Sequence, residues 1–218
     1  MEPRPTEDRV TGRSIAKATR RAALLDAAAH LFAERGYNGV SIEDLGAAAG
    51  VSGPAVYRHF TGKPSVLSAL LTGVSEDLLE GGRAVAEEAS SPEQALKGLI
   101  RFQVEFALGN ADVIRVQDRD LGSLAHDDER NVRSLQRSYV QVWVDELAGF
   151  LPEADRSLLR RRVHAVFGLI NSTPHTAHGT RPGREVGALR ELLQDMAWAA
   201  LTVALPRAPE DTSGRLVR

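Results

Sequence analysis

Apolar residues recur along most of the chain at intervals of three and four, which is the spacing of one buried face of an α-helix. The first clear run comprises Leu24, Ala28, Leu31 and Phe32. Gly36 follows this run directly after Arg35, in the position where a helix commonly ends. No segment shows a convincing alternation of apolar and polar residues, which would indicate a strand. The pattern therefore predicts an all-α fold.

Two short helices are expected next, at about 41–49 and 52–60. Ser41 is a good N-cap, and Asp44 three residues later forms an imperfect capping box with it. Gly50 breaks the first helix, and Ser52 caps the second, which carries Pro54 in its first turn. Leu45, Ala49, Val51 and Val56 are spaced to pack the pair onto the preceding helix. This arrangement predicts a helix-turn-helix, whose second helix can enter the major groove of DNA.

The rest of the chain has the same helical pattern, which gives about nine helices without an internal repeat. A long helix begins near Lys63, and others are expected at about 92–108, 112–119, 128–150, 153–172 and 184–205. The fold is therefore predicted to combine an N-terminal three-helix, helix-turn-helix domain with a larger C-terminal helical bundle. The expected divisions are a disordered arm at 1–14, the DNA-binding domain at 15–62, a ligand-binding and dimerisation domain at 63–206, and a flexible tail at 207–218.

Composition narrows the choice of function. The net charge is −2, but residues 1–63 hold nine Lys and Arg against seven Asp and Glu, while the remainder holds eighteen against twenty-two. A slightly basic head on an acidic body is typical of a protein that contacts phosphates at one end only. The absence of cysteine excludes disulfides and thiolate chemistry. The sequence predicts neither a signal peptide nor a membrane span, so we expect a cytoplasmic protein.

The run from Leu24 to Leu67 resembles the DNA-binding domain of TetR-family regulators. The resemblance is carried by RGY at 35–37, GVSGPAVYRHF at 50–60 and the lysine at position 63. It implies an all-α, two-domain fold, a homodimer, and a variable C-terminal part that binds a small-molecule inducer. The predicted partners are therefore double-stranded DNA with a palindromic operator, an inducer and a second copy of the chain, with no membrane and no cofactor.

The same resemblance implies which residues contact DNA. Tyr57 and Lys63 would bind phosphates, His59 would help to hold the same strand, and Ser41 would bind a phosphate at a helix N-terminus. The groove-facing start of the recognition helix comprises Ser52, Gly53, Pro54, Ala55 and Arg58. Arg58 is the candidate for a guanine contact, with apolar contacts and DNA shape adding specificity. Basic residues Lys17, Arg20 and Arg21 could add contacts, whereas Phe60 is better explained as a core residue.

A ligand pocket is predicted in the C-terminal part, where polar residues, Gln117 among them, lie between aromatic ones. Its candidate residues are Phe102, Gln103, Phe106, Arg115, Arg119, Tyr139, Trp143, His164, Phe167 and Asn171. The two arginines suggest an anionic or acyl-CoA-like ligand, but the segment 113–121 could equally be an ion-pair surface. His175 and His178 lie in a predicted loop without a nearby carboxylate, so we expect no metal site.

Broad apolar stripes on the last two helices predict a dimer interface built as a four-helix bundle. The stripes comprise Val163, Val166, Phe167, Ile170, Leu189, Leu192, Leu193, Met196 and Ala200. The sequence thus favours a ligand-released transcriptional repressor and no enzymatic activity. A small all-α enzyme with Arg115, Arg119 and His164 in its pocket, or an architectural DNA-binding protein without a ligand, remain the alternatives.

Overall fold

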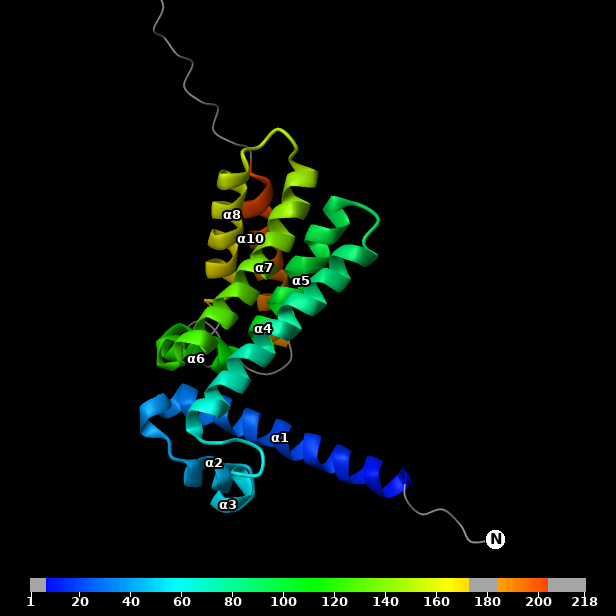
Figure 1. The fold of residues 1–218 in the computed structure, drawn as a ribbon. Helices are drawn as coiled ribbons and strands as arrows, with labels where there is room; N and C mark the ends of the chain where they lie inside the picture. Colours follow the sequence, from blue (N-terminus) through cyan, green and yellow to red (C-terminus); the bar gives the residue numbers. More distant parts are fainter. Residues whose placement is uncertain (1–6, 173–183, 204–218) are drawn as a thin grey trace, which may run out of the picture.

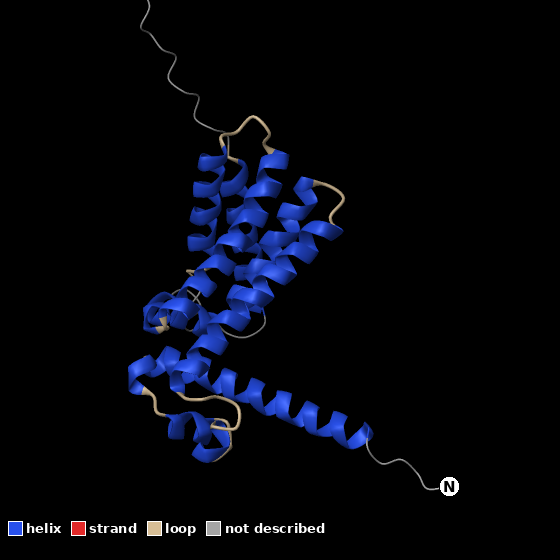
Figure 2. Cartoon of the chain, in the orientation of Figure 1, coloured by secondary structure: helices blue, strands red, loops and turns tan. Residues whose placement is uncertain are grey.

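The structure, a computed structural model, describes residues 7–172 and 184–203. Within these residues it contains nine α-helices and no strand, which confirms the predicted all-α class (Figures 1 and 2). The helices are α1 (Glu7–Arg35), α2 (Ile42–Ala48), α3 (Gly53–Val56), α4 (Lys63–Glu88), α5 (Pro92–Gly109), α6 (Ala111–Asp120), α7 (His126–Phe150), α8 (Arg156–Ile170) and α10 (Arg184–Thr202). No helix in these two ranges is both long and apolar enough to cross a membrane.

Two helix boundaries differ from the sequence expectation. The segment 1–14 was expected to be a disordered arm, yet α1 already begins at Glu7. The last proline of this segment is Pro5, so nothing after it prevents helix formation. The recognition helix α3 is shorter than expected and ends at Val56, with turns continuing to His59. The predicted tail at 207–218 lies outside the described residues.

Small residues and caps define the helix-turn-helix. The capping box at α2 is complete, because the Ser41 hydroxyl accepts from the Asp44 amide and the Asp44 carboxylate accepts from the Ser41 amide. Gly50 has a φ of 67°, a conformation that favours glycine. A Cβ at Gly46 would lie 2.9 Å from the Val51 carbonyl oxygen, so a larger residue would force α2 away from the turn. Leu45 and Val56 are fully buried in the head core.

The head and the body share packing across the expected boundary at 62/63. The core of the DNA-binding head includes Val66, Leu67, Leu70 and Leu71 from the first turns of α4. It also includes Val113 and Val116 from α6, whereas Ile114 of the same helix belongs to the core of the body. In Figure 1, α6 lies between the head below and the bundle above. The helix therefore contributes one face to each part of the molecule.

The body is a bundle of α4, α5, α7, α8 and α10 around the fully buried Trp143. Two consecutive glycines let α4 approach its neighbours closely. A Cβ at Gly81 would lie 2.4 Å from the ring of Phe102, and a Cβ at Gly82 would lie 2.4 Å from the ring of Tyr139. The GG pair is thus a packing feature that brings α5 and α7 against α4.

Candidate DNA-binding surface and ligand cavity

The recognition segment presents its polar side chains to solvent. Ser52, Pro54, Tyr57 and Arg58 are exposed, and the Ser52 side chain forms no capping hydrogen bond. The Tyr57 side chain is 57% exposed, although tyrosine is more often at least partly buried. Phe60, in contrast, is buried in the head core, as its core interpretation predicted. Tyr57 and Arg58 are therefore accessible to a DNA backbone and groove.

The geometry at Ser41 does not favour its predicted phosphate contact. Its hydroxyl donates to the Asp44 carboxylate at 2.6 Å. The hydrogen bonds from the Ser41 hydroxyl and amide keep the pKa of Asp44 below its usual range. A negative charge therefore stands beside a hydroxyl that is already engaged, and Ser41 acts here as a helix cap.

Lys63 is also engaged within the head. Its ammonium donates to the carbonyl oxygens of Tyr37 and Val40, each at 2.8 Å, and lies 4.5 Å from the centre of the Tyr37 ring. These contacts fasten the start of α4 to the loop that follows α1. Because the ammonium already has these partners, its predicted phosphate contact would have to compete with them.

His59 and the basic residues of α1 surround the same surface. His59 is partly buried, and its Nδ1 has no hydrogen-bond partner in the described part of the chain. Lys17, Arg20 and Arg21 are exposed, and the Arg21 guanidinium lies 5.3 Å from the Phe60 ring centre. This contact holds one basic group of α1 close to the end of the recognition segment.

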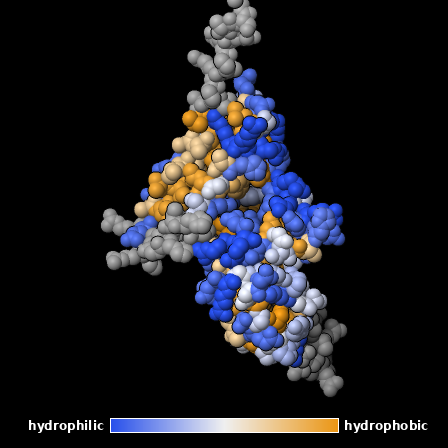
Figure 3. Space-filling view, turned by 90° about the vertical axis from the view of Figure 1, so that its left-hand side faces the viewer, coloured by the Kyte–Doolittle hydropathy of each residue, from blue (hydrophilic) through white to orange (hydrophobic). Residues whose placement is uncertain are grey.

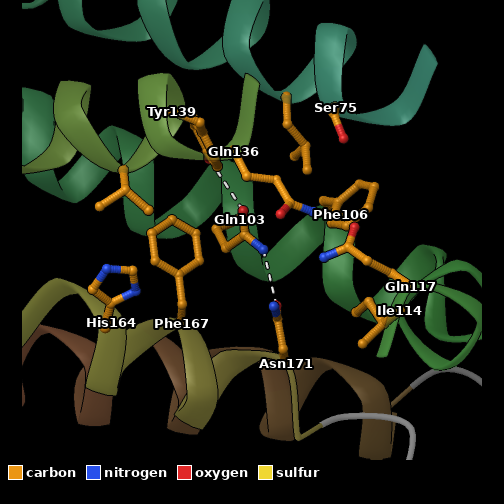
Figure 4. Close-up of a pocket in the computed structure, with 12 residues that line it drawn as sticks. Ser75, Gln103, Phe106, Ile114, Gln117, Gln136, Tyr139, His164, Phe167 and Asn171 are labelled. Atoms are coloured by element: carbon orange, nitrogen blue, oxygen red, sulfur yellow. Dashed lines mark hydrogen bonds between the residues drawn. The ribbon is translucent and has the colours of Figure 1, made fainter. Parts of the chain in front are cut away.

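A cavity of about 180 Å³ lies inside the body, and Figure 4 shows the side chains around it. It is bounded by residues from α4, α5, α6, α7 and α8, together with Asn171 at the end of α8. The lining comprises Ser75, Leu78, Gln103, Phe106, Ile114, Gln117, Gln136, Tyr139, Val140, His164, Phe167 and Asn171. No Asp, Glu, Lys or Arg is among them, so the cavity wall is polar but uncharged apart from the titratable His164.

A chain of hydrogen bonds crosses the cavity at Gln103 (Figure 4). Burial raises the pKa of Tyr139 far above its usual value, so its hydroxyl stays protonated and donates to Gln103 at 3.1 Å. The Gln103 amide then donates to Asn171 at 3.0 Å. The amide nitrogen of Gln136, in contrast, is buried without a partner. A buried unpaired donor is costly, so this group is a natural place for a ligand acceptor.

The structure brings together six of the ten predicted pocket residues. Gln103, Phe106, Tyr139, His164, Phe167 and Asn171 all line the cavity. Trp143 does not, because its ring packs behind Phe167 with 5.0 Å between ring centres. Phe102 instead packs against Gly81 and lines a separate shallow groove beside α5.

The two arginines predicted to hold an anionic ligand lie on the far side of α6, against the head. Arg115 pairs with Asp112 at 3.1 Å, and Asp112 also contacts His30 of α1 at 3.1 Å. Arg119 donates to the carbonyl oxygen of Phe32 and, at 3.4 Å, to that of Ala33, at the end of α1. It also pairs with the buried Asp120 at 2.9 Å. These arginines connect the body to the head and are not among the cavity residues.

The sequence interpretation missed half of the cavity wall. The six lining residues outside the ten candidates are Ser75, Leu78, Ile114, Gln117, Gln136 and Val140, and of these the sequence had singled out only Gln117, as a polar residue near the aromatic ones. Gln117 and Gln136 had a weak signal, since each is an amide one helical turn from a buried residue, Ile114 for Gln117 and Val140 for Gln136. Ser75 gave none, because a serine can be buried in a helix when its hydroxyl donates to the carbonyl four residues before, as Ser75 does at 2.7 Å to Leu71.

The apolar stripes expected at a dimer interface divide between the core and the surface. Val163, Val166, Ile170 and Leu193 are buried within their own subunit, and Phe167 lines the cavity. Leu192 and Met196 are large and exposed, and Ala199 and Val203 continue their row along α10. Figure 3 shows a broad apolar area on the body, on the side of the molecule that carries α8.

No group of three or more potential metal ligands occurs among the described residues. His175 and His178, at which we expected no metal site, lie outside the described part of the chain.

A head with an exposed recognition segment, joined through α6 to a hollow helical body, defines the class of helix-turn-helix transcriptional regulators. The family model "Bacterial regulatory proteins, tetR family" matches residues 24–70. This match, with the relatives and solved structures given next, supports a DNA-binding transcriptional regulator of the TetR family.

Known relatives and solved structures are similar to this protein over most of its length. The repressor KstR2 of Rhodococcus jostii is 28% identical over 189 residues, which cover 85% of this chain and 89% of KstR2. A TetR-family regulator from Bordetella parapertussis has a similar crystal structure, with a TM-score of 0.72, 27% identity, and coverage of 81% of this chain and 93% of that one. FadR of Bacillus subtilis, solved with stearoyl-CoA, shares the fold with a TM-score of 0.64 and 16% identity over 82% of this chain and 98% of FadR.

Proposed function

We propose that this regulator is a repressor that binds a palindromic operator as a homodimer and releases it when a small molecule fills the cavity. KstR2 of R. jostii is a repressor by name, and FadR of B. subtilis was solved with stearoyl-CoA, so regulation by a bound organic molecule has precedent among similar proteins.

The position of α6 is the observation that carries the proposal. Ile114 and Gln117 line the cavity, while Val113 and Val116, each one position earlier, pack in the head core. Arg119 and Asp112 of the same helix bond to α1. A ligand that displaces one face of α6 therefore acts directly on the helix against which the DNA-binding head is packed.

Such a ligand shifts the protein between states only to the extent that it binds one state better. In the operator-binding state the two recognition segments would lie one helical turn apart, about 34–36 Å. Displacement of α6 would tilt each head and change this spacing.

The exposed row on α10 supports the homodimer. Leu192, Met196, Ala199 and Val203 follow one another at intervals of four, three and four residues and so lie on one helix face. Two such faces would bury their apolar surface against each other, as in a four-helix bundle with α8. Because Val163, Val166 and Ile170 already pack inside the subunit, we assign the contact chiefly to α10.

Selection from a random library of double-stranded DNA tests the DNA-binding part of the proposal. The expected product is an inverted repeat with half-sites about 10 bp apart. Arg58→Ala should relax the base preference at one position of each half-site, and Lys97→Ala, an exposed change on the body, should not. An enriched sequence without two-fold symmetry would contradict the dimeric mode of binding.

A reporter gene behind the selected operator then tests repression. Expression of the wild-type protein should lower reporter output, and the Arg58→Ala variant should restore it. Increased output with the wild-type protein would show activation instead of repression.

A further inference from the structure

We propose that the ligand has two parts: an uncharged, ring-sized acyl group that enters the cavity, and an anionic group that binds arginines in the groove between α7 and α8. This inference rests on the proposed function, because it specifies the chemistry of the same ligand.

The groove shares part of its wall with the cavity. It has a volume of about 220 Å³ and is lined by Arg133, Arg137 and Arg160. Three further residues, Gln136, Val140 and His164, line both the groove and the cavity. The two spaces therefore adjoin at these shared side chains, and a single molecule that displaces them can occupy both.

The charges of the two spaces differ sharply. The cavity lining contains no arginine, lysine or carboxylate, whereas the groove lining contains three arginines and no carboxylate. Arg133 is paired with Glu129 at 2.8 Å, and Arg160 donates to the neutral amide of Gln141. Arg137 is exposed and forms no ion pair in the described part of the protein. The groove thus offers at least two guanidinium groups that no carboxylate neutralises, and guanidinium binds phosphate and carboxylate well.

The cavity determines the size and polarity of the acyl part of the ligand. A volume of about 180 Å³ is slightly larger than the roughly 150 Å³ of an engineered apolar cavity that holds benzene. The unpartnered amide nitrogen of Gln136 lies at the junction and calls for an acceptor oxygen. A ring-sized acyl group satisfies both requirements, with its carbonyl near Gln136 and its anionic carrier extending past His164.

Three compounds separate the two parts of the ligand in a calorimetric titration. Benzoyl-CoA has both parts, S-benzoyl-N-acetylcysteamine keeps the acyl thioester without the phosphates, and coenzyme A keeps the phosphates without the benzoyl group. Benzoyl-CoA should bind at least about tenfold more tightly than either fragment, since a single charge-assisted hydrogen bond accounts for a factor of that size.

Paired substitutions then locate the anionic group. Arg137→Gln with Arg160→Gln should weaken benzoyl-CoA about tenfold or more and leave the neutral thioester unchanged. The control is Arg83→Gln with Arg101→Gln, which removes the same charge from exposed positions on α4 and α5 and should change neither affinity. The difference in affinity between benzoyl-CoA and the neutral thioester should also decrease as the salt concentration is raised, because salt screens charges in a groove that is open to solvent.

Each result that differs from these expectations refutes a particular part of the proposed ligand model. Equal affinity for benzoyl-CoA and the neutral thioester would refute the arginine groove while leaving the ligand cavity of the proposed function intact. Coenzyme A binding as tightly as benzoyl-CoA would refute the role of the cavity in this ligand. Absence of binding by all three would refute the inference as a whole, whereas operator selection tests DNA binding independently.

Discussion

Replacing Arg119 with alanine tests the connection between the body and the head. The side chain bonds to the carbonyl oxygens of Phe32 and Ala33 at the end of α1 and pairs with Asp120 at 2.9 Å. Its removal takes one donor from each of these carbonyls, leaves the Gly36 amide, at 2.8 Å, as a donor to Phe32, and leaves the buried Asp120 carboxylate without its cation. Arg119→Ala should therefore reduce both the stability of the protein and the order of α1 at its C-terminal end.

The expected loss follows from these contacts. Hydrogen bonds to charged groups contribute about 1.5–3 kcal/mol each when buried. The Arg119 side chain is 43% exposed, so solvent screening reduces this value, whereas Asp120, at 9%, is not screened in the same way. We expect Arg119→Ala to lower the free energy of unfolding by about 2 kcal/mol in total.

Urea unfolding followed by circular dichroism measures this loss, and hydrogen exchange locates it. Amides at 32–39 should exchange faster in Arg119→Ala. Arg130→Ala is the control, because its pair with Asp127 is largely exposed and should contribute less than about 1 kcal/mol. Equal unfolding free energies for the two variants, with unchanged exchange at 32–39, would refute the role of Arg119. The affinity for benzoyl-CoA should not fall, since Arg119 lies outside the cavity. A loss of affinity would indicate that Arg119 contacts the ligand after all.

Further substitutions test the head, the body and the dimer. Lys63→Met should lower the free energy of unfolding by about 2 kcal/mol, because the carbonyls of Tyr37 and Val40 lose a charged donor. If stability is unchanged and the salt dependence of DNA binding becomes weaker, Lys63 contacts a phosphate instead. Gly82→Ala should lower the melting temperature, since its Cβ would overlap the Tyr139 ring at a cost of about 1–3 kcal/mol, whereas Gly73→Ala, with open space around it, should raise stability by up to about 1 kcal/mol. Leu192→Glu should give a folded monomer in sedimentation at micromolar concentration; a wild-type monomer under the same conditions would exclude the proposed interface.

Local signals in the sequence were sufficient for the helices and for the DNA-binding head. Each of these signals spans only a few residues of the chain: the capping pair Ser41 and Asp44, the turn at Gly50, and the apolar spacing from Leu24 to Phe32. The structure has each of them in the expected place. The start of α1 was wrong because charge and composition in the first fourteen residues were given more weight than the absence of proline after Pro5.

The cavity could be predicted only in part, because its wall comes from five helices. Aromatic and amide residues on apolar faces identified half of its lining, including Gln103 and Asn171. The position of an arginine on α6 depends instead on which face of that helix meets the body, and α6 has a buried face on each side. Periodicity alone cannot tell which of two apolar faces meets the body, so Arg115 and Arg119 were placed on the wrong side.

The two faces of α6 also determine how a ligand can act. Gln117 and Ile114 are the only cavity residues from this helix in the described structure, and Arg119 follows Gln117 by two positions, on the side that meets α1. A ligand that binds both states equally well cannot release DNA, however tightly it binds. Under the proposed mechanism the ligand acts by displacing α6, so we expect an inducer that is slightly too large for the space beside these two residues. The ring-sized volume is then a lower bound on the acyl group, and larger acyl groups on the same anionic carrier should release the operator at lower concentration until the body can no longer open.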